Sequence, residues 1–278
     1  DLVRSRGLGD VYKRQAEDRG AVLSAGVHHT SWMDPNYVVE VMNEIIGRHK
    51  VSQVLYSDSL GCITPEAMRY SIKKIKSGLR KETPISVHHH NDYGLASAST
   101  VAAVTGGATY IDVSINGIGD KGGRASLAEA VIALEVLHGV KTGIRLEKLS
   151  EMSRLVEEKT GIPNEPYKGL TGKESFVYEA EKYVIPIMET SIETTPYLIR
   201  AINPELVGQR REITWGATTL RGEALERKLG GMGLEYTAGD VNRIIEIMKQ
   251  RLDKLSKYPV YLTDPEVEEI CKEALKKK

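Results

Sequence analysis

Apolar and polar residues alternate along a short segment, residues 85–90, which ends in three consecutive histidines, His88, His89 and His90. Side chains of a strand point alternately to its two faces, so His88 and His90 are expected on one face and His89 on the other. Two imidazoles on one face at the end of a strand can bind the same metal ion. The alternative interpretation is a solvated run of histidines on a loop.

Two further segments, 51–58 and 109–116, repeat this pattern of an apolar face beside a face that ends in polar groups. The first segment ends with Tyr56 and Asp58, and the second ends with Asn116. A parallel barrel covers the outer face of its strands with helices and collects functional groups at the carboxyl ends of the strands. The three segments therefore predict a parallel α/β sheet with a site at one edge.

Helix signals separate these strands and predict four strand–helix units, the first with a strand at residues 21–27. Asp34 followed by Pro35 is typical of a helix cap and first turn. Further helices are expected over residues 65–77, 93–105 and 125–138. A closed eight-stranded barrel needs about 250 residues, and only about 120 carry this alternation. We therefore expect residues 16–145 to form a partial TIM (β/α) barrel, represented by its later strands.

From residue 146 the pattern changes to helices joined by irregular connections. Helices are expected over residues 146–159, 222–229 and 237–255, and from Thr263 onward. Their apolar stripes are ordinary amphipathic patterning, so residues 146–278 are predicted to form a mostly helical subdomain. Residues 1–15 show neither periodicity nor an initiating Met, and we interpret them as a scar of sequencing or cloning.

Composition narrows the class of protein. A chain of 278 residues with 41% hydrophobic and 27% charged residues and a formal net charge of zero is typical of a soluble globular protein of one or two domains. This neutrality gives no reason to expect nucleic acid or a membrane as a partner, and no apolar run approaches the roughly 20 residues of a membrane span. Cys62 and Cys271 cannot build a disulfide framework, so we expect a cytoplasmic protein.

Four motifs occur in a fixed order along the chain. They are Asp-Ser-Leu-Gly at 58–61 with Thr-Pro-Glu at 64–66, His-His-His-Asn-Asp-Tyr-Gly-Leu-Ala at 88–96, Asn-Gly-Ile-Gly-Asp-Lys-Gly-Gly-Arg at 116–124, and Asn-Pro-Glu-Leu-Val-Gly at 203–208. The set resembles the metal-dependent 2-isopropylmalate, homocitrate and citramalate synthases, which are related to hydroxymethylglutaryl-CoA lyase. The last motif is similar to an element of the synthases and favours them over the lyases.

This resemblance implies an acyltransferase that condenses acetyl-CoA, its co-substrate, with a 2-oxo acid. His88 and His90 would ligate Mg²⁺, Mn²⁺ or Zn²⁺ together with an aspartate that we expect in a preceding segment, and the ion would polarise the ketone. The carbanion of the acetyl-CoA methyl group would attack that ketone, and thioester hydrolysis would drive the reaction. We expect a homodimer whose partners are small molecules, and expect the chain by itself to be inactive.

Further site residues follow from the same resemblance. Asp58 and Ser59 would shape the floor of the oxo-acid pocket, and Asn116, Gly117 and Gly119 would approach the bound acyl-CoA closely. The alternative for Asp58 is a structural role in which it bonds to neighbouring strand ends.

The chain departs from the family pattern at three places. Residues 28–32 stand where the family has an acidic pair and an arginine, and none of these three residues occurs here. Tyr183 stands where the synthases have a histidine that is assigned a role in proton transfer. Arg124 replaces an asparagine, and its guanidinium cannot ligate a metal but can pair with a carboxylate. This change predicts an oxo acid with a second, distal carboxylate, unless Arg124 turns outward toward Glu129 or solvent.

Two alternatives to the synthase stay open. A carbon–carbon lyase on the same barrel would cleave a CoA ester instead of consuming acetyl-CoA. A non-catalytic regulatory paralogue would account for Arg124 and for the missing histidine, and its metal content would distinguish it from both enzymes.

Overall fold

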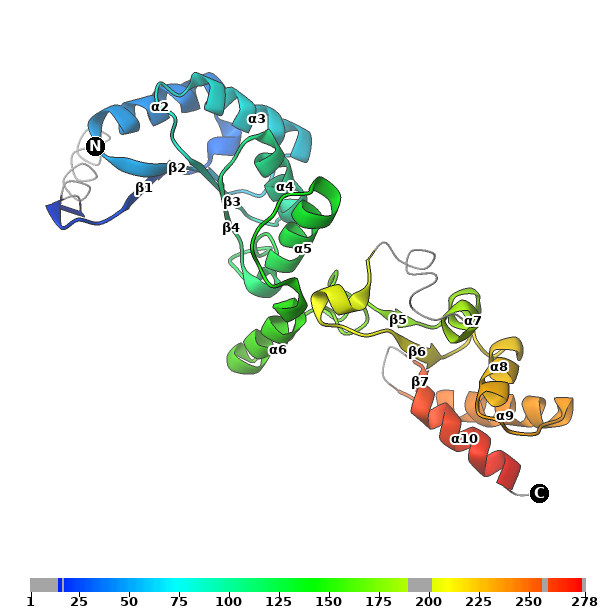
Figure 1. Ribbon diagram of the computed structural model, residues 1–278. Helices are drawn as coiled ribbons and strands as arrows, with labels where there is room; N and C mark the ends of the chain where they lie inside the picture. Colours follow the sequence, from blue (N-terminus) through cyan, green and yellow to red (C-terminus); the bar gives the residue numbers. More distant parts are fainter. Residues whose placement is uncertain (1–14, 17, 190–201, 257–259, 277–278) are drawn as a thin grey trace. The chain divides into compact units, whose positions relative to one another are not determined.

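The computed structural model describes residues 15–16, 18–189, 202–256 and 260–276 (Figure 1). Residues 1–14 of the predicted scar lie outside the described residues. The chain forms two compact units, one of residues 1–145 with 155–162 and one of residues 146–154 with 163–278. Every helix of the described residues is too short or too polar to span a lipid bilayer.

The first unit is built on a parallel sheet of four strands in the order β1-β2-β3-β4. The strands are β1 (Leu23–Val27), β2 (Val51–Asp58), β3 (Ile85–His89) and β4 (Tyr110–Asp112), and the crossover helices are α2 (Pro35–Arg48), α3 (Pro65–Gly78) and α4 (Ala96–Gly106). Parallel neighbours require such crossovers, and Figure 1 shows the helices along one side of the sheet. The predicted α/β class is confirmed, and in the described residues the strands do not close into a barrel.

Local signals fix where the first helices begin. The Asp34 carboxylate accepts a hydrogen bond from the backbone N–H of Asn36 at 2.7 Å, and a proline follows each cap of α2 and α3. The helix after β3 begins at Ala96, three residues later than its predicted start, because the chain first makes a turn. In this turn the Asn91 side chain accepts from the backbone N–H of Ala96 at 3.1 Å, and Gly94 has φ 71°.

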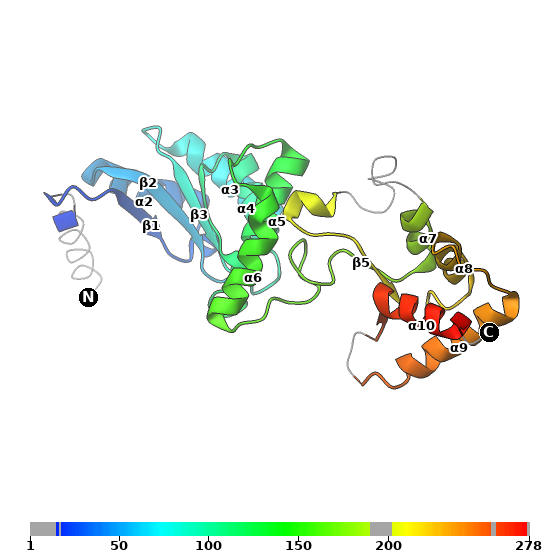
Figure 2. The same ribbon diagram turned by 60° about the horizontal axis from the view of Figure 1, so that its bottom comes forward.

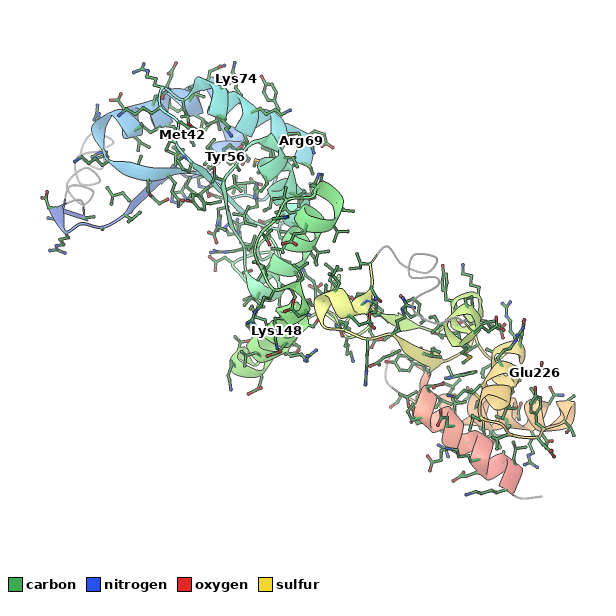
Figure 3. All side chains as sticks on the ribbon, in the orientation of Figure 1. Met42, Tyr56, Arg69, Lys74, Lys148 and Glu226 are labelled. Carbon is green, nitrogen blue, oxygen red and sulfur yellow. The ribbon has the colours of Figure 1, made fainter. Side chains whose placement is uncertain are left out.

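The core of the first unit lies between the sheet and α2 and α3. Met42 of α2 and Tyr56 of β2, both labelled in Figure 3, are buried in it together with Ile72 of α3. Helices α3 and α4 approach closely at Gly106, where an added Cβ would lie 3.0 Å from the carbonyl oxygen of Arg69. This packing holds the helices against the sheet and fixes the positions of the strand ends.

The predicted strand over 109–116 ends early, at Asp112. Ser114 instead pairs with residues 125–127, since its N–H donates to the Ala125 carbonyl at 3.0 Å and its carbonyl accepts from the Leu127 N–H at 2.9 Å. The chain then forms a short helix, η2 (Ile115–Gly117), in which Asn116 has φ 59°. The helix expected over 125–138 comprises α5 (Leu127–Ile132) followed by a π-helical turn, η3 (Ala133–Leu137).

The second unit contains the expected helices (Figure 2) and a small sheet that the sequence analysis missed, whose strands are labelled in Figure 1. Its helices are η4 (Leu146–Lys148), α6 (Leu149–Thr160), which extends into the first unit, α7 (Glu181–Glu189), η5 (Pro204–Val207), α8 (Glu223–Gly231), α9 (Ala238–Leu252) and α10 (Asp264–Lys276). Its strands are β5 (Val177–Tyr178), β6 (Glu212–Trp215) and β7 (Leu262–Thr263), in the order β5-β6-β7. Strands of two to four residues are too short to produce a visible alternation of apolar and polar positions.

Polar contacts join the elements of the second unit. Trp215 of β6 is buried, and its indole N–H donates to the Asp264 carboxylate at 2.9 Å. The Lys228 ammonium of α8 donates to Asp264 at 2.6 Å and to Glu268 at 2.7 Å, which ties α8 to α10. Helix α9 begins with a capping box between Thr237 and the third helical residue.

Candidate metal and substrate site

The polar residues of the predicted site meet at the carboxyl ends of β2, β3 and β4. The register pairs Asp58 with His89 across β2 and β3, and pairs His88 with Asp112 across β3 and β4. In parallel α/β sheets, ligands bind at this edge. It is here that the structure brings together the predicted residues of the first unit.

His88 and His90 share a face, as the alternation predicts, with their ring centroids 5.0 Å apart in an edge-on arrangement. His89 points the other way and is fully buried, with its Nδ1 2.9 Å from the Thr100 hydroxyl oxygen. Burial lowers the pKa of His89 to about 4, although the Asp58 charge opposes this shift. His89 is therefore a neutral core residue, and the two histidines beside it carry the candidate chemistry.

Asp112 holds His88 in place, and the sequence analysis had assigned Asp112 no role. Its Oδ2 lies 2.7 Å from the Nδ1 of His88 and 3.9 Å from a terminal guanidinium nitrogen of Arg124. A carboxylate on Nδ1 fixes the tautomer and leaves Nε2 as the nitrogen that can bind a ligand. The alternation of β4 puts Asp112 on the polar face, but only the register of β3 with β4 identifies its partner.

His90 is held by its backbone and has an unsatisfied imidazole nitrogen. Its N–H donates to the Asp58 carbonyl at 3.2 Å, and it forms a bridge with Arg124 on the other side. In the described part of the chain, its buried Nδ1 has no hydrogen-bond partner. Burial, and then the nearby charge of Lys121, lower the pKa of His90, so the imidazole favours the neutral form that binds metals.

Asp58 lies at the same edge but uses its oxygens locally. It is 2% exposed, and it accepts hydrogen bonds from the Ser31 hydroxyl at 2.6 Å and from the backbone N–H groups of Cys62 and Ile63 at 3.3 Å. These contacts support the structural alternative for Asp58. The Ser59 hydroxyl accepts a hydrogen bond from the backbone N–H of His29 at 3.2 Å. His29 belongs to the segment 28–32 that lacks the family's acidic pair, so this segment contributes a backbone contact here.

The glycines of the 116–124 loop make room for Arg124. The Gly117 carbonyl accepts from the Arg124 N–H at 2.9 Å, and a Cβ on Gly119 would lie 2.6 Å from the Cγ of Arg124. The loop also carries Lys121, whose ammonium bonds to the Ser59 carbonyl and lies 3.5 Å from Asp92. The sequence analysis assigned Lys121 no role, and its ammonium ties this loop to Ser59 and Asp92.

Tyr183 belongs to the second unit. Its ring packs edge-on against the ring of Tyr178, at a centroid distance of 6.4 Å, and the Lys182 ammonium lies 4.8 Å from its centroid. Its side chain is partly exposed.

The residues at the strand ends fit part of a metal site. Two imidazoles, one oriented by a carboxylate and one with a buried unsatisfied nitrogen, are donors that suit a divalent metal ion such as Zn²⁺. The described residues contain no group of three or more His, Cys, Asp or Glu side chains that could hold an ion. His88 and His90 would therefore supply two protein ligands, and other donors would complete the coordination.

Comparison with known proteins shows synthases among the relatives of this chain. It is 36% identical over 245 residues to an (R)-citramalate synthase of Methanocaldococcus jannaschii. This alignment covers 87% of this chain and 48% of that protein. It is 36% identical over 244 residues to a 2-isopropylmalate synthase of the same organism, and this alignment covers 87% of this chain and 45% of that synthase. A homocitrate synthase of Methanopyrus kandleri is 36% identical over 219 residues, and this alignment covers 79% of this chain and 52% of that synthase. The chain spans about half the length of these relatives.

The fold has solved counterparts as well. The structure matches a hydroxymethylglutaryl-CoA lyase of Pseudomonas aeruginosa with a TM-score of 0.50 at 21% identity, over 56% of this chain and 55% of that one, a likeness that concerns the fold. The sequence profile of the HMGL-like family matches residues 9–156, which is more than half of the chain and includes every strand of the first unit. The chain therefore belongs to the HMGL-like family.

Proposed function

We propose that the full-length protein condenses acetyl-CoA with a 2-oxo acid in a metal-dependent reaction. The observation that carries this proposal is the pair of imidazoles on one face, with His88 bonded to Asp112 at 2.7 Å. The names of the relatives, all synthases of 2-hydroxy acids, support the same reaction class. A divalent ion supplies, when bound, the polarisation of the ketone.

The chain's own residues would position the reactants. Asp112 holds the His88 ring in one tautomer, and His90 offers a neutral nitrogen at the same edge. In the reaction a C–H bond of the acetyl methyl group breaks, the methyl carbon bonds to the ketone carbon, and the ketone oxygen takes up a proton. Water then cleaves the thioester and releases free CoA. We assign Tyr183 an assisting role in proton transfer, because its partly exposed phenol can donate and accept a proton.

Arg124 would select the oxo acid. Its terminal guanidinium nitrogen lies 3.9 Å from Asp112, and in the described residues its buried Nε has no hydrogen-bond partner. A guanidinium with an unused donor favours a carboxylate, which supports a dicarboxylic oxo acid such as oxaloacetate or 2-oxoglutarate. The Asp112 charge at 3.9 Å competes with a substrate carboxylate, so the preference is expected to be moderate.

Metal content and CoA release test the reaction class. The full-length protein should bind Mg²⁺, Mn²⁺ or Zn²⁺ stoichiometrically, the double variant His88→Ala/His90→Ala should lose this binding, and the variant His138→Ala, at an exposed position, should keep it. A thiol assay with acetyl-CoA and 2-oxoisovalerate, pyruvate, oxaloacetate or 2-oxoglutarate should show release that chelation stops. Bound metal without release from any of them would favour the lyase, and absence of metal would favour the regulatory paralogue.

Arg124→Asn tests substrate selection. Loss of the charge-assisted pair should lower kcat/KM for the dicarboxylic oxo acid about tenfold to a hundredfold and leave monocarboxylic acids little changed. An equal loss for both classes would mean that Arg124 does not contact the distal carboxylate. The homodimer, the cytoplasmic location and the inactivity of the chain by itself stay predictions.

A further inference from the structure

One carboxylate oxygen of Asp112 has two partners with different roles in the proposed reaction. Its Oδ2 lies 2.7 Å from the Nδ1 of His88 and 3.9 Å from a terminal guanidinium nitrogen of Arg124. His88 is a candidate ligand of the divalent ion, and Arg124 is the candidate contact of the distal carboxylate of the oxo acid. Asp112 therefore lies between the proposed metal ligand and the proposed substrate contact.

The backbone holds these three residues in place. The register of β3 and β4 pairs Asp112 with His88. Arg124 forms a bridge with His90, and its N–H donates to the Gly117 carbonyl at 2.9 Å. Because both partners of Asp112 are held in this way, a change of charge at one partner acts on the other through the electric field, without a movement of the loop.

Solvent reaches the two charged groups but hardly reaches His88. The side chains of Asp112 and Arg124 are 47% and 32% exposed, whereas the side chain of His88 is 12% exposed. A carboxylate of a ligand can therefore approach the guanidinium from solvent. The pair of Asp112 and Arg124 is long and solvated, so a ligand carboxylate can compete with Asp112 for the guanidinium.

The charge of Arg124 opposes metal binding. A guanidinium repels a divalent ion, and it attracts the same Asp112 oxygen that orients His88 and makes its ring a stronger donor. A substrate carboxylate on Arg124 would cancel this positive charge and leave the Asp112 charge to act on His88. Conversely, an ion on His88 would attract the Asp112 charge and reduce its repulsion of the substrate carboxylate.

We propose that Arg124 and Asp112 couple the two ligands, so that a dicarboxylic oxo acid and the divalent ion bind cooperatively. This coupling rests on the proposed function, since it needs both ligands at this edge of the sheet. Coupling between two binding sites is reciprocal and is typically about 5- to 150-fold. Solvent screens the exposed pair of Asp112 and Arg124, so we expect about threefold to tenfold.

The metal affinity of the full-length protein, measured without acetyl-CoA, tests this coupling. The ion is whichever of Mg²⁺, Mn²⁺ and Zn²⁺ binds most tightly, and its Kd is measured with and without saturating 2-oxo acid, with the free ion corrected for complexes in solution. Pyruvate is the matched ligand, because it can chelate the ion through the same 2-oxo acid group but lacks the distal carboxylate. Oxaloacetate or 2-oxoglutarate should lower the Kd of the ion about threefold to tenfold more than pyruvate does.

Two substitutions remove the coupling from opposite ends. Arg124→Gln should abolish the excess of the dicarboxylic acid over pyruvate and should raise the metal affinity without acid about twofold to fivefold, because the repelling charge is lost. Asp112→Asn should bring the excess below about twofold and should lower the metal affinity without acid. A general loss of structure would not produce these opposite changes. Arg80→Gln, at an exposed position before β3, should change neither quantity.

Thermal unfolding checks the fold of each variant, and Arg124→Met replaces Arg124→Gln, with the same expectation, if the latter does not fold. The coupling is wrong if metal binds but neither dicarboxylic acid exceeds pyruvate, or if the excess persists in the folded Arg124 variant. Absence of metal binding would overturn the proposed function together with the coupling. Bound metal and the expected excess, but no release of CoA, would overturn the proposed reaction alone.

Discussion

Replacing Asp112 by asparagine should weaken metal binding at the histidine pair. The side chain keeps its shape but loses the charge that orients His88 through a 2.7 Å contact. Loss of a carboxylate behind a ligating histidine costs roughly 10- to 100-fold in metal affinity, or about 1.4 to 2.7 kcal/mol. The Asp112 side chain is 47% exposed and Arg124 lies 3.9 Å from the same oxygen, so solvent and a competing cation reduce the effect. We therefore expect a loss of about tenfold.

The affinity is measured by competition between the full-length protein and a fluorescent chelator for Mn²⁺ or Zn²⁺. Asp120→Asn is the matched control, because it removes the same charge from the adjacent loop at an exposed position. An unchanged affinity in Asp112→Asn, or an equal loss in Asp120→Asn, would refute the orienting role of Asp112. An equal loss in the two variants would leave general electrostatics as the only contribution of Asp112, and an unchanged affinity in Asp112→Asn would leave Asp112 no contribution to metal binding.

Three further predictions concern stability, measured by urea denaturation. Ile72→Ala should destabilise the first unit by about 2 to 5 kcal/mol, because it empties a fully buried position, and a loss below about 1 kcal/mol would contradict the packing described. Lys228→Met should cost about 1 to 2 kcal/mol at neutral pH through the bonds lost to Asp264 and Glu268. Burial opposes the charge of Lys228, but these bonds still raise its pKa, and the bond from Lys228 lowers the pKa of Glu268. This contribution should be full between the ordinary pKa values of 4.5 for Glu268 and 10.5 for Lys228. It should disappear as the pH rises through the raised pKa of Lys228, and the part from Glu268 should disappear as the pH falls through the lowered pKa of Glu268. A difference between variant and parent that is independent of pH would contradict it. Thr237→Ala should cost about 1 kcal/mol through loss of the capping box, and Thr237→Ser should retain most of it.

The features that the sequence predicted correctly depend on neighbouring residues. Asp34 and Thr64 each precede a proline, and a cap acts over the next two or three residues, so the starts of α2 and α3 are correct. His88 and His90 share a face because alternation is a property of a single strand. The same argument explains why the two histidines could be paired without knowledge of the rest of the fold.

The features that were missed depend on contacts across the fold. Ser114 leaves the expected strand because it pairs with Ser126, twelve residues away, and alternation within the strand contains no information about that pairing. The partnership of Asp112 with His88 needs the register of two strands separated by a helix. Similarly, Asp58 is recognised in the sequence as the first residue of the motif at 58–61. Its contacts with residues 31 and 62–63, however, depend on how two loops meet.

The close approach of Gly119 to Arg124 couples the two positions in sequence evolution. A methyl group at 119 would fall 2.6 Å from the Cγ of Arg124 and would force the guanidinium away from Asp112. With a side chain at 124 that stops at Cβ, the same methyl group would meet no such atom, so Gly119→Ala and Arg124→Ala should show non-additive effects on stability. An arginine at 124 is accommodated in this conformation by glycine at 119, so the presence of the arginine restricts which substitutions position 119 accepts without a shift of the side chain.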